Sequence, residues 1–227
     1  MRRTARGIMG SLLSAVAVGS LTFAGLAGAT HLMNEPGGSA MFTQQADSVE
    51  TTTHSNSTLS PGDRIYINTY GPGSTMHKTC TVTYVDSATR TAATAGHCAE
   101  ANSPVYDEAC NLIGTATRNP GAKDIATISL NNTVKVDAKD FTRTKPNKSM
   151  LGQRVCTIGA TTRVERCGRI IDIDKDGKFN ATAGLRGKSG DSGGPVWTDN
   201  KQLIGIYAGG WSQDHTPIAG GYGYLLD

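Results

Sequence analysis

The stretch Gly190-Asp191-Ser192-Gly193-Gly194-Pro195 sets one serine among three glycines and is the most informative segment of the chain. Glycine tolerates positive φ and lets another backbone approach closely, so this segment can turn sharply and present the Ser192 hydroxyl beside main-chain amides. A serine hydroxyl is a weak nucleophile that needs a base, an acid to orient the base, and N–H donors for an oxyanion. An isolated Asp-Ser-Gly tripeptide is typical of an ordinary turn, so the interpretation depends on a base and an acid elsewhere in the chain.

The candidate base is His97, which closes the run Thr91–Cys98, where a strand-like segment ends in small residues. A disulfide from the adjacent Cys98 to Cys80 could fix the backbone of this histidine. A lone histidine after a strand is more often structural, and here the neighbouring residues reverse that expectation. The other four histidines lie in polar stretches where exposed residues are expected: His31, His54, His77 and His215.

The candidate acid is Asp124, which begins the apolar run Asp124–Leu130. A carboxylate that orients a histidine must be held near the ring and largely out of water, and the start of an apolar strand provides such a position. Asp107 and Asp137 lie in more polar surroundings. Without the histidine and the serine, Asp124 would be interpreted as a turn or strand-start residue.

The N-terminal part of the chain is expected to lie outside the folded domain. Residues 1–29 have the pattern of an export signal, because three arginines precede an uncharged stretch that ends in small residues. A membrane anchor is the alternative, and the glycines within the stretch disfavour it. Residues 30–60 are polar and poor in large apolar side chains, which predicts a disordered leader or short propeptide. The folded domain is expected over 61–227.

The charge balance bears on whether the chain binds nucleic acid or an anionic membrane. The chain has 22 Lys and Arg against 19 Asp and Glu, and removal of the expected signal, which holds three of the arginines, leaves 19 of each. A neutral mature chain gives no reason to expect nucleic acid or an anionic membrane as the partner.

Short β-rich runs separated by Gly, Asn, Asp or Pro follow Pro61, and helical periodicity is not convincing. This spacing predicts an all-β sandwich or barrel, and 28 glycines suit its turns and bulges. The expected strands are Arg64–Tyr70, Thr79–Val85, Arg90–Ala95, Leu112–Thr117, Ile125–Leu130, Arg154–Ile158, Val164–Ile173, Val196–Thr198, Leu203–Tyr207 and Tyr222–Leu226.

Three motifs follow one another along the chain: Thr94–Cys98, Asp124–Ala126 and Gly190–Pro195. In this order they resemble the three signatures of the chymotrypsin-like serine proteases. The compact spacings and the export signal make the chain most similar to the bacterial streptogrisin-type branch. The resemblance covers roughly Arg64 to Leu226 and implies two six-stranded antiparallel β-barrels with the active site between them.

The resemblance implies a role for each motif residue. His97 would act as general base and then general acid, Asp124 would orient it, and Ser192 would form the acyl-enzyme. The amides of Gly190 and Ser192 would form the oxyanion hole. The segment Gly205–Gly210 would border the primary specificity pocket and pair with the substrate backbone, so we expect contacts to substrate from Tyr207, Ala208, Gly209 and Gly210.

Five cysteines in an exported chain suggest disulfides and leave one thiol over. Cys156 and Cys167 are close in sequence and flank a turn-like stretch, which makes them a natural pair. Cys80 and Cys98 each lie beside a strand-like run. The family resemblance implies both pairings, and Cys110 is then the odd cysteine.

The residues before the serine, Gly184–Ser189, would line the specificity pocket in a family member, and they contain no acid that would select Lys or Arg. Arg186 or Lys188 could favour an acidic side chain, although pairing of either cation with Asp191 or exposure to solvent is the simpler interpretation. We therefore expect an apolar or small side chain in the pocket. Ala208 stands where the family usually has a serine that supports the aspartate.

Two other classes of protein fit parts of the pattern. Gly190-x-Ser192-x-Gly194 also matches the nucleophile elbow of α/β-hydrolases, but those esterases place the histidine after the serine and alternate strands with helices. The second class is a secreted binding module that keeps the protease fold without using it, or with weak activity. The presence of all three candidate catalytic residues favours an enzyme.

No metal or organic cofactor is expected. The segment Asp172–Gly177 starts like a calcium loop, but Ala183 stands at the twelfth position, where a bidentate Glu is needed, so a hairpin turn at Lys175–Lys178 is preferred. The expected partner is a protein or peptide substrate. The sequence thus predicts a secreted bacterial endopeptidase that acts as a monomer.

Overall fold

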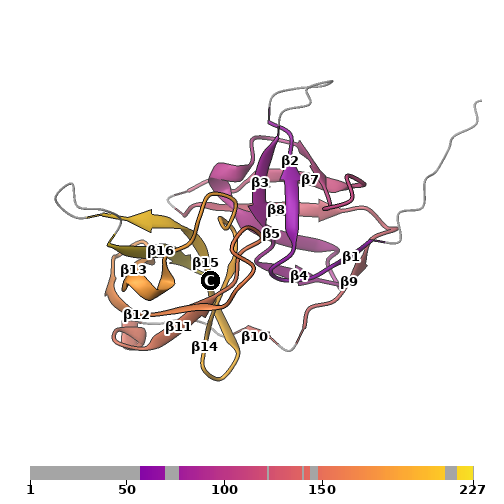
Figure 1. Ribbon diagram of the computed structural model, residues 1–227. Helices are drawn as coiled ribbons and strands as arrows, with labels where there is room; N and C mark the ends of the chain where they lie inside the picture. Colours follow the sequence, from indigo (N-terminus) through magenta and orange to yellow (C-terminus); the bar gives the residue numbers. More distant parts are fainter. Residues whose placement is uncertain are drawn as a thin grey trace, which may run out of the picture. The chain divides into compact units, whose positions relative to one another are not determined.

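The computed structural model describes residues 57–69, 77–121, 123–139, 141–143, 148–212 and 219–226, and strands dominate these segments (Figure 1). Three short 3-10 helices accompany them: η1 (Gly96–Cys98), η2 (Lys148–Met150) and η3 (Ala183–Leu185). No helix in these segments is long and apolar enough to cross a membrane. The all-β prediction is confirmed. The expected export signal, most of the expected leader, and His31, His54 and His215 lie outside the described residues.

The first large sheet lies in the N-terminal half of the described chain and has the strand order β3-β2-β6-β7-β8-β5-β4, with antiparallel neighbours. Its strands are β2 (Arg64–Ile67), β3 (Lys78–Thr81), β4 (Tyr84–Asp86), β5 (Thr91–Ala95), β6 (Ser103–Tyr106), β7 (Leu112–Arg118) and β8 (Ile125–Leu130).

This sheet closes because β3 and β4 are two parts of one bent strand, joined by Val82 and Thr83. The Val82 N–H donates to the Asp63 carbonyl at 2.9 Å, and the Thr83 N–H donates to the Ala93 carbonyl at 2.8 Å, so pairing continues through the bend. The result is a six-stranded barrel. Its interior is filled by side chains that are 0 % exposed, among them Ile65, Ile67, Val82, Val105, Ile113 and Ile128.

The second large sheet has the order β10-β15-β14-β11-β12-β13-β16, and β15 also pairs with β16. Its strands are β10 (Thr142–Arg143), β11 (Arg154–Thr157), β12 (Arg166–Ile173), β13 (Lys178–Ala181), β14 (Pro195–Thr198), β15 (Gln202–Trp211) and β16 (Gly220–Leu225). The β15–β16 pairing makes six antiparallel strands cyclic and curls the sheet around a second core. The prediction of two six-stranded barrels is thus confirmed. Two short parallel strand pairings accompany the barrels.

The two parallel pairings each involve a short strand. Strand β10 joins the second sheet in parallel with β15, and β1 (Thr58–Leu59) pairs in parallel with β9 (Lys135–Val136). Leu59 is 2 % exposed and belongs to the first core, so the fold includes Thr58 and Leu59, which the sequence assigned to the leader. One buried leucine in a polar stretch is too weak a signal for a composition-based boundary.

Strand β15 contributes to both cores. Leu203 and Ile206 pack with the first core, whereas Ile204 and Tyr207 pack with the second. All four side chains are at most 1 % exposed. The two barrels therefore meet along β15, and the segments that carry the candidate site residues lie at this junction.

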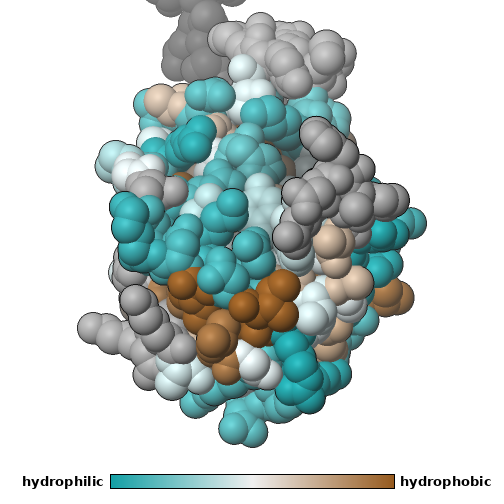
Figure 2. Space-filling view, turned by 90° about the vertical axis from the view of Figure 1, so that its left-hand side faces the viewer, coloured by the Kyte–Doolittle hydropathy of each residue, from teal (hydrophilic) through white to brown (hydrophobic). Residues whose placement is uncertain are grey.

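The outer face of the second barrel carries exposed apolar side chains. Leu151 is 58 % exposed and Ile171 is 47 % exposed, and their backbones are adjacent because the Gly152 N–H donates to the Ile170 carbonyl at 2.8 Å. Figure 2 shows hydrophobic residues gathered in one area of a face that is otherwise mostly hydrophilic. Leu151 and Ile171 belong to neither of the two hydrophobic cores.

Candidate active site

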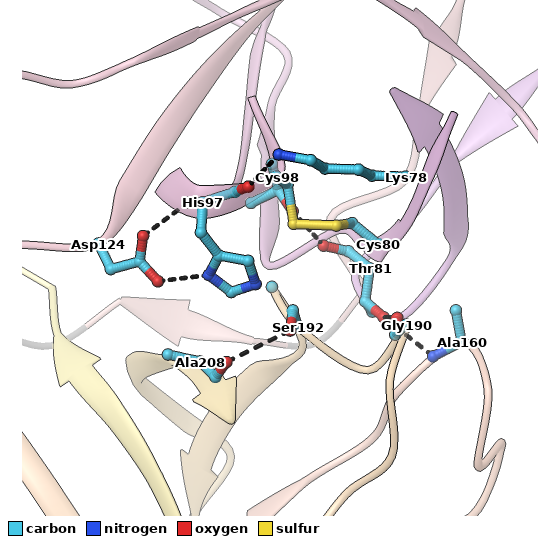
Figure 3. The surroundings of a disulfide bond; sticks show 12 residues. Lys78, Cys80, Thr81, His97, Cys98, Asp124, Ala160, Gly190, Ser192 and Ala208 are labelled. Carbon is cyan, nitrogen blue, oxygen red and sulfur yellow. Dashed lines mark hydrogen bonds and ion pairs between the residues drawn. A yellow bond between two sulfur atoms is a disulfide. The ribbon is translucent and has the colours of Figure 1, made fainter. Parts of the chain in front are cut away.

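His97 lies in η1, directly after β5, and its backbone is fixed on both sides. The neighbouring Cys98 forms a disulfide with Cys80 of β3, and the Lys78 ammonium donates to the His97 carbonyl at 2.8 Å (Figure 3). A side chain at Gly96 would place its Cβ 2.8 Å from the Ile125 nitrogen. Glycine is therefore required just before His97, because the chain passes so close to the start of β8.

Asp124 precedes β8 and uses both carboxylate oxygens on His97. The His97 backbone N–H donates to Oδ1 at 2.6 Å, and ring Nδ1 lies 2.6 Å from Oδ2 (Figure 3). The Asp124 side chain is 12 % exposed and that of His97 is 44 % exposed. A mostly buried carboxylate thus holds an accessible imidazole in one orientation, which is what we expected of an orienting acid.

The electrostatics keep Asp124 ionised. Burial by itself would raise the pKa of Asp124, but the hydrogen bonds from His97 and the charge that His97 can carry outweigh it, and the pKa lies below the ordinary value of 3.8. The carboxylate can therefore stabilise a positive imidazolium at neutral pH.

Ser192 lies on a tight turn between the candidate oxyanion residue Gly190 and strand β14. Gly190 has φ of +93° and Gly193 has φ of +92°, conformations that L side chains rarely adopt. A Cβ at Gly193 would lie 2.1 Å from the Thr81 carbonyl oxygen. The Ser192 hydroxyl donates to the Ala208 carbonyl at 3.3 Å, and Figure 3 shows the His97 ring between Asp124 and Ser192.

Thr81 and Thr83 of the first barrel donate hydrogen bonds to the turn that carries Ser192. The sequence interpretation missed these bonds. The Thr81 N–H donates to the Ser192 carbonyl at 2.8 Å, and the Thr81 hydroxyl donates to the Gly190 carbonyl at 2.8 Å. The Thr83 hydroxyl donates to the Gly193 carbonyl at 2.5 Å. Both threonines are 0 % exposed. The only sequence signal was the presence of hydroxyl residues in a strand that also carries a disulfide cysteine.

The amides expected to bind an oxyanion belong to this fixed turn. With the carbonyls of Gly190 and Ser192 both accepting from Thr81, the peptide planes around Ser192 have a set orientation. In the described part of the chain, no group accepts a hydrogen bond from the Gly190 or Ser192 amide. Neither N–H group thus has an acceptor among the described residues, and both could donate to a ligand oxygen.

Asp191 is 2 % exposed and anchors the loop before the serine. Oδ1 accepts from the backbone N–H groups of Thr161 and Thr162 at 2.9 Å each, and Oδ2 accepts from the Lys188 N–H at 2.7 Å. Both carboxylate oxygens of Asp191 thus accept from backbone donors. Arg186 is exposed on the loop after η3.

Two mycobacterial proteins are similar in sequence to this chain. No family model matches the chain. The chain is 31 % identical over 153 residues to the uncharacterized protein Rv1815 of Mycobacterium tuberculosis H37Rv, covering 58 % of this chain and 68 % of that protein. The uncharacterized protein MT1863 of strain CDC 1551 gives the same identity and coverage. The chain belongs to the family of these mycobacterial proteins.

Solved structures with the same fold are bacterial proteases. The Thermobifida fusca protease A structure covers 74 % of this chain and 91 % of its own, with a TM-score of 0.51 and 23 % identity. The Nocardiopsis protease structure covers 75 % and 93 %, with a TM-score of 0.53 and 20 % identity. This family member therefore has the chymotrypsin-like two-barrel fold, as the three motifs predicted.

Both predicted disulfides are present in this family member. Cys80 bonds to Cys98, and Cys156 bonds to Cys167, whereas Cys110 is free and exposed. The described residues include one group of atoms close enough to hold a metal ion, formed by Cys156, Cys167 and Glu165. Its two sulfur atoms are bonded to each other, so the group offers no thiolate ligands.

The expected substrate-binding segment is β15. Gly209 and Gly210 lie at its accessible end, while Ala208 is 3 % exposed and receives the Ser192 hydroxyl on its carbonyl. Tyr207 is 1 % exposed, so its side chain is enclosed rather than presented to a bound ligand. Because Ala208 has no hydroxyl to offer, the hydrogen bonds to Asp124 come from His97 alone among the described residues.

Proposed function

We propose that the chain is a serine endopeptidase that uses Ser192, His97 and Asp124. The observation that carries the proposal is the pair of 2.6 Å contacts from His97 to the two oxygens of Asp124. These contacts fix the ring with Nδ1 on the carboxylate, so Nε2 is free for proton exchange on the side where Figure 3 draws Ser192. This is the arrangement that a serine nucleophile requires.

The proposed reaction proceeds in two halves. His97 Nε2 takes the proton of the Ser192 hydroxyl as Oγ attacks the scissile carbonyl carbon, and the amides of Gly190 and Ser192 donate to the oxyanion. The intermediate collapses when the C–N bond breaks and Nε2–H protonates the leaving amine. Water then attacks the acyl-enzyme carbonyl carbon and gives a proton to Nε2. The C–Oγ bond breaks, Nε2–H returns the proton to Oγ, and the carboxylic acid product leaves. Water is the only co-reactant in this scheme.

A weakly active or inactive binding module is the second candidate, and one observation favours it. The Ser192 hydroxyl donates to the Ala208 carbonyl at 3.3 Å, so it must rotate before Nε2 can accept its proton. Catalytic hydrogen bonds often tighten only when substrate is bound, so the free state does not exclude the enzyme. The two candidates differ in whether Ser192 reacts.

The proposed setting is extracellular. Two disulfides support it, since disulfides persist in oxidising compartments and are rare in the bacterial cytosol. The proposed partner is a peptide or protein substrate, consistent with a fold shared with bacterial proteases. A monomer remains the expected oligomeric state.

The test is covalent labelling of the purified protein with a fluorophosphonate probe, followed by peptide mapping. We expect the label on Ser192 and none in the Ser192→Ala or His97→Ala variants. Ser129→Ala, an exposed serine on β8, is the matched control and should label like the parent. Absence of labelling in a folded parent would favour the binding module. Matched amide and ester substrates separate the peptidase from an esterase, which would cleave the ester alone.

A further inference from the structure

Tyr207 is the largest side chain at the junction between β15 and the loop that precedes Ser192. Its ring belongs to the second core and is 1 % exposed. Its hydroxyl oxygen accepts the Gly187 backbone N–H at 2.7 Å. The phenol therefore reaches out of the core and ends against the main chain of the loop that leads to the candidate nucleophile.

The Tyr207 ring packs against the backbones of two glycines, Gly187 and Gly221. A Cβ at Gly187 would lie 3.0 Å from ring atoms Cε1 and Cζ, and a Cβ at Gly221 of β16 would lie 3.0 Å from Cε2. A side chain at either glycine would therefore press against the ring, so neither position has room for a further group. The tyrosine thus fills the space between the loop Gly187–Ser192 and β16.

This filled space lies next to the candidate nucleophile. The Gly193 N–H donates to the Tyr207 carbonyl at 2.8 Å, and the Tyr207 N–H donates to the Gly194 carbonyl at 2.8 Å. The following residue, Ala208, accepts the Ser192 hydroxyl. Tyr207 is therefore tied by its main chain to the turn that holds Ser192 and by its side chain to the loop before it.

A bound peptide must bring its scissile carbonyl to the Gly190 and Ser192 amides. If its preceding backbone pairs with β15, as the family resemblance implies, it lies beside Gly209 and Gly210 at the accessible end of the strand. With its backbone there, the residue that supplies this carbonyl would direct its side chain toward the loop Gly187–Ser192, where the Gly187 N–H donates to the Tyr207 hydroxyl. That is the direction in which Tyr207 already fills the interior.

We propose that Tyr207 closes the recess beside Ser192, so that the residue supplying the scissile carbonyl must be glycine or alanine. This inference rests on the proposed peptidase function and narrows its substrate class. The hydroxyl anchor keeps the recess closed, because a ring that swung out would leave the Gly187 N–H without its acceptor. Burial first, and then the nearby Asp191 charge, raise the pKa of Tyr207 above its ordinary value of 10.0, so the anchor stays neutral.

The experiment compares peptides that differ only in the residue supplying the scissile carbonyl: Gly, Ala, Leu or Phe. We expect the parent to cleave the Ala peptide with a kcat/KM at least about 100-fold above the Phe peptide, because rejection by filled space is steep. Tyr207→Val should raise the Phe-to-Ala ratio by about 10-fold or more, since it empties the recess. Tyr207→Phe keeps the ring and should retain the order of preference.

Tyr106→Val, in β6 of the first barrel, is the matched control and should leave the preference unchanged. A parent that cleaves the Phe peptide as well as the Ala peptide would overturn the inference, even if Tyr207→Val failed to fold. So would a folded Tyr207→Val variant with unchanged preference. In both of these results the fluorophosphonate still labels Ser192, so the peptidase proposal stands. No labelling of a folded parent overturns the peptidase proposal and this inference together.

Discussion

Thr81→Val removes one hydroxyl from the junction of the two barrels and leaves the side-chain shape nearly unchanged. Thr81 is 0 % exposed. Its hydroxyl donates to the Gly190 carbonyl at 2.8 Å and accepts the Ala160 N–H at 3.0 Å (Figure 3). Its backbone N–H still donates to the Ser192 carbonyl in the variant. The substitution therefore leaves one carbonyl and one amide without partners, and both bonds are buried.

The expected magnitude follows from these two groups. A buried polar group left without a partner costs about 1–3 kcal/mol, so the free energy of unfolding should fall by about 2–6 kcal/mol. The substitution should also lower kcat, because the hydrogen bond to the Gly190 carbonyl helps to orient the turn that carries the proposed oxyanion donors. Full loss of one such donor costs about 100-fold to 1,000-fold in kcat, and a loosened donor should cost about 10-fold.

Chemical denaturation and steady-state kinetics on a short peptide substrate test this prediction together. Because the oxyanion forms only in the transition state, kcat should fall while KM changes little. Thr81→Ser restores the hydroxyl and should recover most of both losses. Thr83→Val removes only the bond to the Gly193 carbonyl, beyond the serine, and should cost stability with less effect on kcat. Parent-like kcat in Thr81→Val, or a Ser variant no better than the Val variant, would refute the reasoning.

Asp124→Asn should lower kcat by about 10,000-fold, measured on the same peptide, because the amide no longer stabilises the imidazolium. Since the pKa of Asp124 is lowered from 3.8, its stabilising contribution is present above that pH and is lost as the pH falls through the lowered value. Asp124→Asn should therefore reduce the free energy of unfolding more at pH 7 than in strong acid, where the carboxyl group is protonated, and equal losses at both would contradict the assignment. Replacing either disulfide by alanines should cost about 3 kcal/mol for closed segments of 18 and 11 residues, read from thermal melts. Loss of Cys80–Cys98 should also reduce kcat, because Cys98 follows the histidine, whereas loss of Cys156–Cys167 should leave kcat of the residual folded protein close to the parent value.

Strand prediction from sequence succeeded where β-branched residues cluster and failed where strands are short and polar. The range Ile125–Leu130 was predicted with its observed bounds. Strand β6 was missed because Pro104 and Ser103 occupy half of its four positions, and β13 was missed because Lys178–Ala181 has one large apolar residue. Both strands exist because their neighbours in the barrels supply hydrogen bonds and buried surface, which a local window does not contain.

The candidate triad was predictable for a different reason. Each member lies in a short motif whose chemistry is local: glycines beside a serine, small residues before a histidine, and an aspartate at the start of an apolar strand. The support from Thr81 was not predictable, since its hydroxyl meets the Gly190 carbonyl 109 residues along the chain. In sequence, a threonine in a strand is explained by β-propensity alone. Only the docking of the two barrels gives its hydroxyl a partner.

The enclosure of Tyr207 follows from the same docking and limits how the site can adapt. An isolated strand with one buried face would alternate inward and outward residues, but β15 buries Ile206 in the first core and Tyr207 in the second. A shift of β15 to widen the recess would disturb both cores at once. Movement of the β15 backbone would therefore destabilise the fold, whereas a smaller residue at position 207 would leave the strand in place. The size of the side chain that fits beside Ser192 is thus set by residue 207 and by the two glycine backbones against its ring.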